Sequence, residues 1–118
     1  MAGHHTILIV EDEPLIAMML EDFLDSLGHR VSGSCDTVQC ALDEVEKGGF
    51  DLAILDVNLK GENVWSVATR LRERNIPFVI ATGGHVDPPP PEFNDAPVIE
   101  KPYTVDRVTP AIEAALAA

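Results

Sequence analysis

The sequence predicts an α/β domain in which parallel strands alternate with helices. Short apolar runs of strand length recur along the chain, and the stretches between them carry apolar residues at helical spacing. The strongest runs are continuously apolar, which is typical of strands buried on both faces of a sheet. At 118 residues the chain suits one domain, and we expect residues 1–118 to form it.

The first strand and helix are expected near the amino terminus. The run TILIV, residues 6–10, is rich in β-branched residues and predicts the first strand. Residues 14–27 follow with apolar side chains at helical spacing. Pro14 suits the first turn of this helix and Gly28 suits its end, so these segments form one βα unit.

The next unit is less apolar. Residues 30–35 (RVSGSC) are small and polar, which favours a strand at the edge of the sheet. A helix is expected up to Lys47, with Asp36 as its cap and a pair of glycines after its end. The run LAIL, residues 52–55, predicts the third strand.

The third unit ends in an unusual segment. Residues 63–75 have one apolar face and one charged face, which predicts the third helix, and FVIA, residues 78–81, predicts the fourth strand. Residues 83–97 then contain five prolines, four of them consecutive. Because such a run cannot lie inside a helix, we expect a proline-rich loop that replaces or shortens the fourth helix.

A fifth strand is expected over residues 97–99 and a last helix over residues 104–116. Pro110 lies inside that helix and should either kink it or delay its start to Thr109. Right-handed crossovers leave few arrangements for five such units. The simplest is a flavodoxin-like, doubly wound sheet of order 2-1-3-4-5 with helices on both faces.

Composition excludes several functions. Eight basic and 20 acidic residues give a formal net charge of −12, which repels nucleic acid and anionic membranes. No apolar run approaches the roughly 18 residues of a membrane-spanning helix, and residues 1–6 lack the features of a signal peptide, so we expect a cytoplasmic protein. Cys35 and Cys40 make neither a disulfide framework nor a zinc site, and we expect reduced thiols.

Polar or charged residues follow four of the predicted strands: Glu11 with Asp12, then Asp56, Thr82 and Lys101. Because the carboxyl ends of parallel strands meet at one edge of a sheet, we expect these side chains to converge. Three carboxylates repel one another unless a cation neutralises them, and hard oxygen ligands suit Mg²⁺. With a hydroxyl and a lysine beside them, they predict a phosphoryl site in which Asp56 is the nucleophile.

The segments ILIVEDEP, LAILDVNLKG, ATGG and EKP, in this order and spacing, resemble the receiver domain of two-component response regulators, over essentially the whole chain. The resemblance implies that Asp56 is the phosphoacceptor. It also implies that Asp12 and Asp56 bind Mg²⁺ directly, that Glu11 acts through water, and that the backbone carbonyl of Asn58 is a further ligand.

The resemblance assigns the other strand-end residues to signalling. Thr82 is implied to contact the phosphoryl oxygens and to move on activation, while Lys101 pairs with the phosphoryl group and a cis bond precedes Pro102. The family usually has an aromatic residue three positions before this lysine, where the chain has Val98. Tyr103 is a candidate replacement, although an ordinary packed aromatic is the expected role.

The stretch IATGGH with its proline-rich continuation is similar to a receiver subgroup known for a FATGUY motif, although Ile80 and His85 depart from the aromatic positions of that motif. Receivers of this subgroup have an altered fourth helix and work with a divergent class of sensor histidine kinases. The resemblance therefore implies the same class of partner for this chain.

The leading hypothesis is a stand-alone response regulator without an output domain. It would accept a phosphoryl group from a sensor histidine kinase or a histidine phosphotransfer protein, lose it by slow self-dephosphorylation, and signal by binding a downstream protein. One alternative is a phosphatase of the haloacid dehalogenase type, but such enzymes need a second acid where Asn58 stands. The other is a binding module that is never phosphorylated, which the presence of the acids, Thr82 and Lys101 disfavours.

Overall fold

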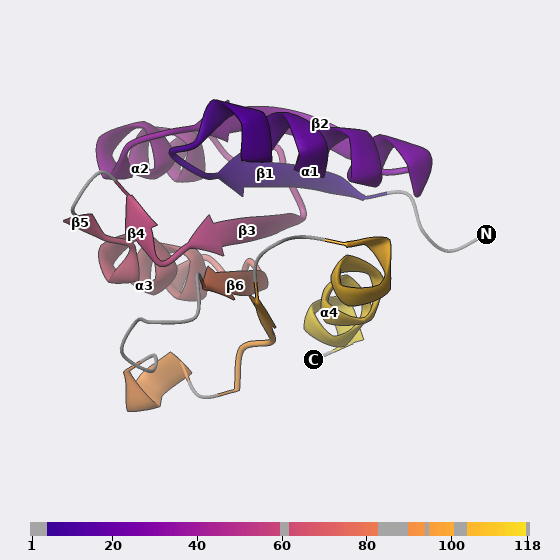
Figure 1. The fold of residues 1–118 in the computed structure, drawn as a ribbon. Helices are drawn as coiled ribbons and strands as arrows, with labels where there is room; N and C mark the ends of the chain where they lie inside the picture. The colour runs from indigo at the N-terminus through magenta and orange to yellow at the C-terminus, as the bar shows by residue number, and fades with distance from the viewer. Residues whose placement is uncertain (1–4, 60–61, 83–89, 94, 101–103, 118) are drawn as a thin grey trace.

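The computed structural model describes residues 5–59, 62–82, 90–93, 95–100 and 104–117 (Figure 1). The main sheet is made of β1 (Thr6–Val10), β2 (Arg30–Cys35), β3 (Leu52–Asp56), β6 (Phe78–Thr82) and β7 (Val98–Glu100). All neighbouring strands in it pair in parallel, in the order β2-β1-β3-β6-β7. This is the predicted order 2-1-3-4-5, with the weakly apolar strand β2 at one edge as expected.

Four α-helices cover the two faces of this sheet (Figure 1). They are α1 (Pro14–Ser26), α2 (Val38–Lys47), α3 (Trp65–Glu73) and α4 (Val105–Ala117). Successive residues of β1 point to opposite faces, so Leu8 packs in the core under α2 and α3 while Ile9 packs in the core under α1 and α4. Among the helices described, none has the length and apolar character needed to cross a bilayer.

A short hairpin follows β3 and was not predicted. It consists of β4 (Asn58–Leu59) and β5 (Glu62–Asn63), which pair antiparallel. Leu59 is fully buried in the core under α2 and α3, and the Val64 amide donates a hydrogen bond to the Val57 carbonyl at 3.2 Å. The hairpin therefore ties the end of β3 to the start of α3.

Three helix starts differ from the prediction. Helix α3 begins at Trp65, because Asn63, where it was expected to begin, lies in β5. Thr37, rather than Asp36, caps α2, because its Oγ1 accepts the Cys40 amide at 3.1 Å. Helix α4 begins at Val105 and continues through Pro110, which rules out the later start at Thr109. Pro110 is exposed, and the Thr104 carbonyl accepts the Val108 amide at 2.9 Å in the first turn.

Between β6 and β7 the described residues contain one 3₁₀ turn, η1 (Pro91–Phe93), in agreement with the expected proline-rich connection. Phe93 is 3 % exposed, and its ring stacks on Trp65 at 5.7 Å and meets the edge of Phe78 at 5.8 Å. The Arg72 guanidinium lies 5.3 Å from the Phe93 ring centre and donates hydrogen bonds to the Glu92 carbonyl and the Asp95 carboxylate. This set of contacts fastens the segment to α3.

Replacing Phe93 with leucine should lower the free energy of unfolding by about 1–2 kcal/mol, because leucine stays apolar but loses the ring stacking and the cation–π contact. Chemical unfolding followed by the fluorescence of Trp65, the sole tryptophan, measures this loss. As a control, Phe23→Leu changes a partly buried ring of α1 and should cost less. Equal losses in both variants would contradict the fastening role of Phe93.

Candidate functional site

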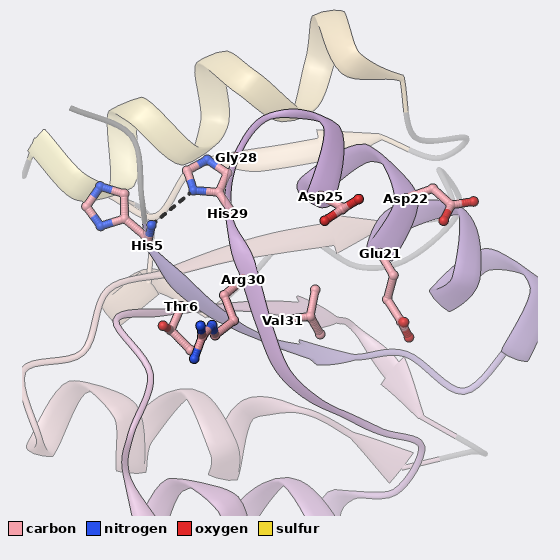
Figure 2. Close-up of a pocket in the computed structure, with 9 residues that line it drawn as sticks. All are labelled: His5, Thr6, Glu21, Asp22, Asp25, Gly28, His29, Arg30 and Val31. Atoms are coloured by element: carbon pink, nitrogen blue, oxygen red, sulfur yellow. Dashed lines mark hydrogen bonds between the residues drawn. The ribbon is translucent and has the colours of Figure 1, made fainter. Parts of the chain in front are cut away.

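One cavity, of about 650 Å³, lies beside the starts of β1 and β2, at the amino-terminal edge of the sheet (Figure 2). Three carboxylates of α1, the Arg30 guanidinium and the rings of His5 and His29 line it. The His5 amide donates a hydrogen bond to His29 Nδ1 at 3.3 Å. Ligands of open parallel sheets bind at the opposite, carboxyl-terminal edge, and the candidate site lies there.

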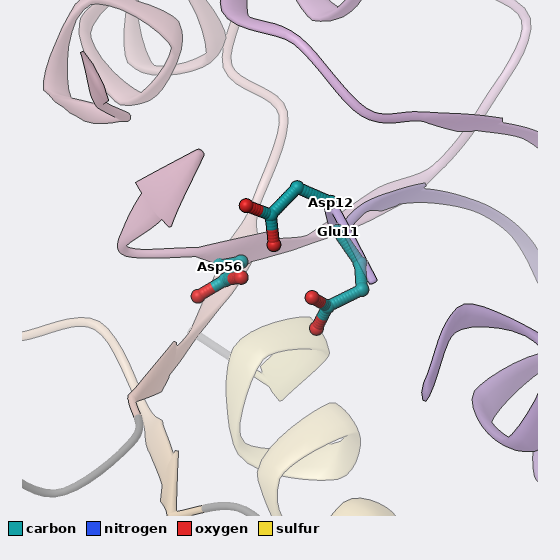
Figure 3. A group of neighbouring side chains, drawn as sticks. All are labelled: Glu11, Asp12 and Asp56. Atoms are coloured by element: carbon teal, nitrogen blue, oxygen red, sulfur yellow. The ribbon is translucent and has the colours of Figure 1, made fainter. Parts of the chain in front are cut away.

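At the carboxyl-terminal edge, the side chains of Glu11, Asp12 and Asp56 lie together (Figure 3). Each offers one carboxylate oxygen, and these oxygens lie within 4.8 Å of one another. Glu11 is 2 % exposed and Asp56 is 5 % exposed, whereas Asp12 is half-buried. Within the described part of the chain, this cluster is the group of acidic, histidine or cysteine side chains placed to hold a metal ion.

Strand pairing explains why these acids meet. Val10 of β1 lies opposite Leu55 of β3, so the residues that follow them, Glu11 and Asp56, leave adjacent strands at the same level. The Glu11 amide donates to the Cys35 carbonyl at 2.9 Å, which continues the pairing of β1 with β2 by one residue. The Glu11 carboxylate accepts the amide of Glu13 at 3.1 Å. Both hydrogen bonds hold the turn that leads into α1.

Thr82 lies on the next strand at the same edge. Asp56 is paired with Ala81 of β6, and the Val57 amide donates to the Ala81 carbonyl at 3.1 Å. Thr82 follows immediately as the last residue of β6 and is half-buried. The structure therefore places four of the predicted residues, the three acids and Thr82, on three neighbouring strand ends.

The remaining predicted residues are placed less completely. Asn58 is the first residue of β4, where its backbone pairs with Asn63. Lys101, Pro102 and Tyr103 lie outside the described residues, as does His85. The roles expected of them stay predictions from the sequence, in which residues 101–103 follow β7 and His85 follows β6.

The acid cluster fits a hard divalent cation. Its donors are carboxylate oxygens, the type of ligand that Mg²⁺ and Ca²⁺ prefer. Two of the three carboxylates are almost fully buried, where charge is costly unless an opposite charge compensates it. Three carboxylates from the described residues leave coordination positions for water and a phosphate oxygen, which matches the preference of Mg²⁺.

Three residues outside the acid cluster bear on expectations from the sequence. Val98, at the position where the family usually has an aromatic, is 49 % exposed on β7. Cys35 and Cys40 form a disulfide, so the expectation of two reduced thiols was wrong. The five-residue separation of the two cysteines does not predict this bond. The two Cα atoms come within 5.5 Å of each other only because of the turn from β2 into α2.

The sequence model of one protein family, the response regulator receiver domain, matches residues 7–113. The chain belongs to the response regulator receiver family. This receiver is similar to SdrG from Sphingomonas melonis Fr1, whose solution structure shares 56 % sequence identity with it at a TM-score of 0.88 and covers 98 % of this chain and 99 % of SdrG. It also resembles the receiver domain of PhyR from Erythrobacter litoralis, with 30 % identity, a TM-score of 0.78, and coverage of 98 % of this chain and 92 % of that one.

Among curated proteins, the receiver is 34 % identical over 84 residues to the transcriptional regulatory protein TorR of Escherichia coli K12. That match covers 70 % of this chain and 36 % of TorR. Its match to YkoG of Bacillus subtilis, 33 % identical over 119 residues, covers 97 % of this chain and 51 % of YkoG. The chain thus spans about a third to a half of the length of these two relatives.

Proposed function

We propose that this receiver accepts a phosphoryl group on Asp56 from a phosphohistidine of a sensor histidine kinase or a histidine phosphotransfer protein. Glu11, Asp12 and Asp56 would hold Mg²⁺ for this transfer, together with the backbone carbonyl of Asn58. The observation that carries the proposal is the cluster of three carboxylates within 4.8 Å at the carboxyl edge of the sheet, two of them buried. Membership of the receiver family supports the same chemistry.

The transfer itself requires a positioned carboxylate. Asp56 ends a buried central strand that is paired on both sides, so its carboxylate is held in place at the carboxyl edge of the sheet. A carboxylate oxygen forms a bond to phosphorus as the bond from phosphorus to the histidine nitrogen breaks, and the released imidazole takes a proton from water. When bound, Mg²⁺ supplies charge neutralisation for the carboxylates and for the phosphoryl oxygens.

The other strand ends supply polar contacts to the phosphoryl group. Thr82, next to the residue paired with Asp56, offers a hydroxyl that can donate to a phosphoryl oxygen. Lys101, which follows Glu100 at the end of β7, offers a positive charge for the same group. The phosphoryl group on Asp56 would be hydrolysed slowly. We therefore propose a signalling role and no metabolic turnover.

We propose that this receiver signals by binding a downstream protein with the surface around β6 and β7. Phe93 fastens the connection between these strands to α3, and Val98 exposes an apolar side chain on β7 next to it. A net charge of −12 disfavours nucleic acid or an anionic membrane as the direct partner. We propose that residues 1–118 act as one receiver domain in the cytoplasm.

A direct assay uses a small phosphodonor in place of the kinase. Incubation with acetyl phosphate and Mg²⁺ should add the mass of one phosphoryl group to the intact protein, and EDTA should prevent the addition. The expected mass shift needs both the acid cluster and the metal. No addition with Mg²⁺ present, or addition that EDTA leaves unchanged, would contradict the proposal.

A further inference from the structure

The disulfide between Cys35 and Cys40 is connected to the acid cluster by the hydrogen bond from the Glu11 amide to the Cys35 carbonyl, and the phosphoryl transfer proposed above does not use it. Cys35 is the last residue of the edge strand β2 and is 2 % exposed. Cys40 lies in the first turn of α2 and is half-buried at the margin of the core. The bond therefore joins the end of a strand to the start of the helix that follows it.

Both cysteines are positioned by contacts that do not involve sulfur. Cys35 is paired with Val10 of β1, and its carbonyl accepts the Glu11 amide at 2.9 Å. The Cys40 amide donates to Thr37 Oγ1, the cap of α2. Their Cα atoms are 5.5 Å apart, within the range that a disulfide spans without backbone movement. The two thiols of the reduced protein should thus remain side by side.

We propose that Cys35 and Cys40 form a reversible redox site, oxidised by peroxide and reduced by dithiols, that adjusts the affinity of the neighbouring acid cluster for Mg²⁺. Cys40 is the more exposed of the two and reacts first: its sulfur takes one oxygen from hydrogen peroxide to give a sulfenic acid and water. The Cys35 thiol then attacks this sulfur, which forms the disulfide and releases a second water. A dithiol such as thioredoxin's returns two electrons and two protons by exchange.

A single hydrogen bond connects the backbone of Cys35 to the backbone of Glu11 in the acid cluster. The Cys35 carbonyl accepts the amide of Glu11, whose side chain belongs to the cluster and whose neighbour, Asp12, belongs to it as well. The closed bond fixes the turn that carries this carbonyl, so the oxidised protein should hold the acids closer to their binding positions. This effect on Mg²⁺ rests on the function proposed above, whereas the redox chemistry does not.

The redox chemistry is tested on the full chain without any phosphodonor. Reduced protein is treated with hydrogen peroxide, and remaining thiols are alkylated and counted by mass. We expect both thiols to be lost together, with a mass lower by two hydrogens, a monomer on a non-reducing gel, and full recovery with dithiothreitol. Persistent thiols, a disulfide-linked dimer, or oxidation to sulfinic acid without a disulfide would overturn the proposal.

A matched variant separates the roles of the two sulfurs. Cys40→Ala keeps a helix former in the first turn of α2 and removes the more exposed thiol. The remaining Cys35 should then resist peroxide, because it is almost fully buried. Trp65 fluorescence checks that the variant folds, and Cys40→Ser serves if it does not. Oxidation of Cys35 at the wild-type rate in the folded variant would overturn the assigned order of reaction.

The coupling is tested by titration calorimetry with Mg²⁺ in both redox states. The oxidised wild type should bind Mg²⁺ on the order of threefold more tightly than the reduced wild type, a smaller effect than loss of a residue that orients a ligand directly. Cys40→Ala should bind equally under both conditions. Equal affinities in wild type, or a difference that persists in the variant, would overturn the coupling. Absence of phosphoryl incorporation in both redox states would instead refute the proposed function alone.

Discussion

Replacing Asp56 with asparagine is expected to abolish phosphoryl incorporation from acetyl phosphate, by more than about 100-fold in rate. The amide has nearly the shape of the carboxylate but lacks its nucleophilic oxygen and its charge. Asp56 is only 5 % exposed and lies within 4.8 Å of two other carboxylates. The neutral amide removes one of these three clustered charges and fits the same space, so the substitution should leave the fold intact. The rate is read from intact mass against time, with Mg²⁺ present.

The matched control is Asp51→Asn. Asp51 lies just before the other end of the same strand, is exposed, and accepts the Thr6 amide at 2.9 Å, a hydrogen bond that an asparagine oxygen can also accept. This variant loses the same charge and should incorporate phosphoryl groups at the wild-type rate. Incorporation by Asp56→Asn at a rate close to that of Asp51→Asn would refute the assignment of Asp56 as nucleophile.

Replacing Asp12 with asparagine should slow incorporation about 100-fold and weaken Mg²⁺ binding by about 10–100-fold, because one of three charged ligands is lost. The same change should raise the free energy of unfolding in EDTA by about 1 kcal/mol, since it relieves repulsion among the carboxylates. Asp12 is half-buried, so an amide fits in its place. Calorimetry measures the binding, and unfolding followed by Trp65 fluorescence measures the stability.

Glu13→Gln provides the comparison for Asp12. Glu13 is the next residue along the chain and is exposed, and it contributes its backbone amide, not its side chain, to the hydrogen bond with Glu11. Its variant should keep the Mg²⁺ affinity and the EDTA stability of the wild type. Tight Mg²⁺ binding by Asp12→Asn, or weak binding by Glu13→Gln, would show that the cation is held elsewhere.

Much of this fold could be predicted because local pattern and tertiary structure agree. The run TILIV alternates its side chains between two cores, so it had to be apolar throughout, and that is the pattern visible in the sequence. Pro14 begins α1, and Gly28 adopts a φ of 89° after its end, a conformation that glycine reaches without strain. The acid cluster followed from the same reasoning, because strand ends in register bring their next residues together.

Other features depend on contacts distant in sequence and left no local pattern. Phe93 lies in a proline-rich stretch that predicts only a loop, yet its ring is buried against α3 and β6. The cap of α2 was assigned to Asp36, a residue type that suits that position, and only the hydrogen bond from the Cys40 amide shows that Thr37 is the cap. Pro110 was expected either to kink α4 or to delay its start to Thr109, and the structure excludes the delay, because α4 begins at Val105 with Pro110 inside it.

The central claim is that Asp56 carries the phosphoryl group, and chemical trapping tests it most directly. Borohydride reduces an aspartyl phosphate to homoserine, which marks the acceptor in the peptide map. After incubation with acetyl phosphate and Mg²⁺, we predict homoserine at position 56 and at no other aspartate. Homoserine at another position, or phosphorylated protein that borohydride leaves unmodified at position 56, would contradict the account.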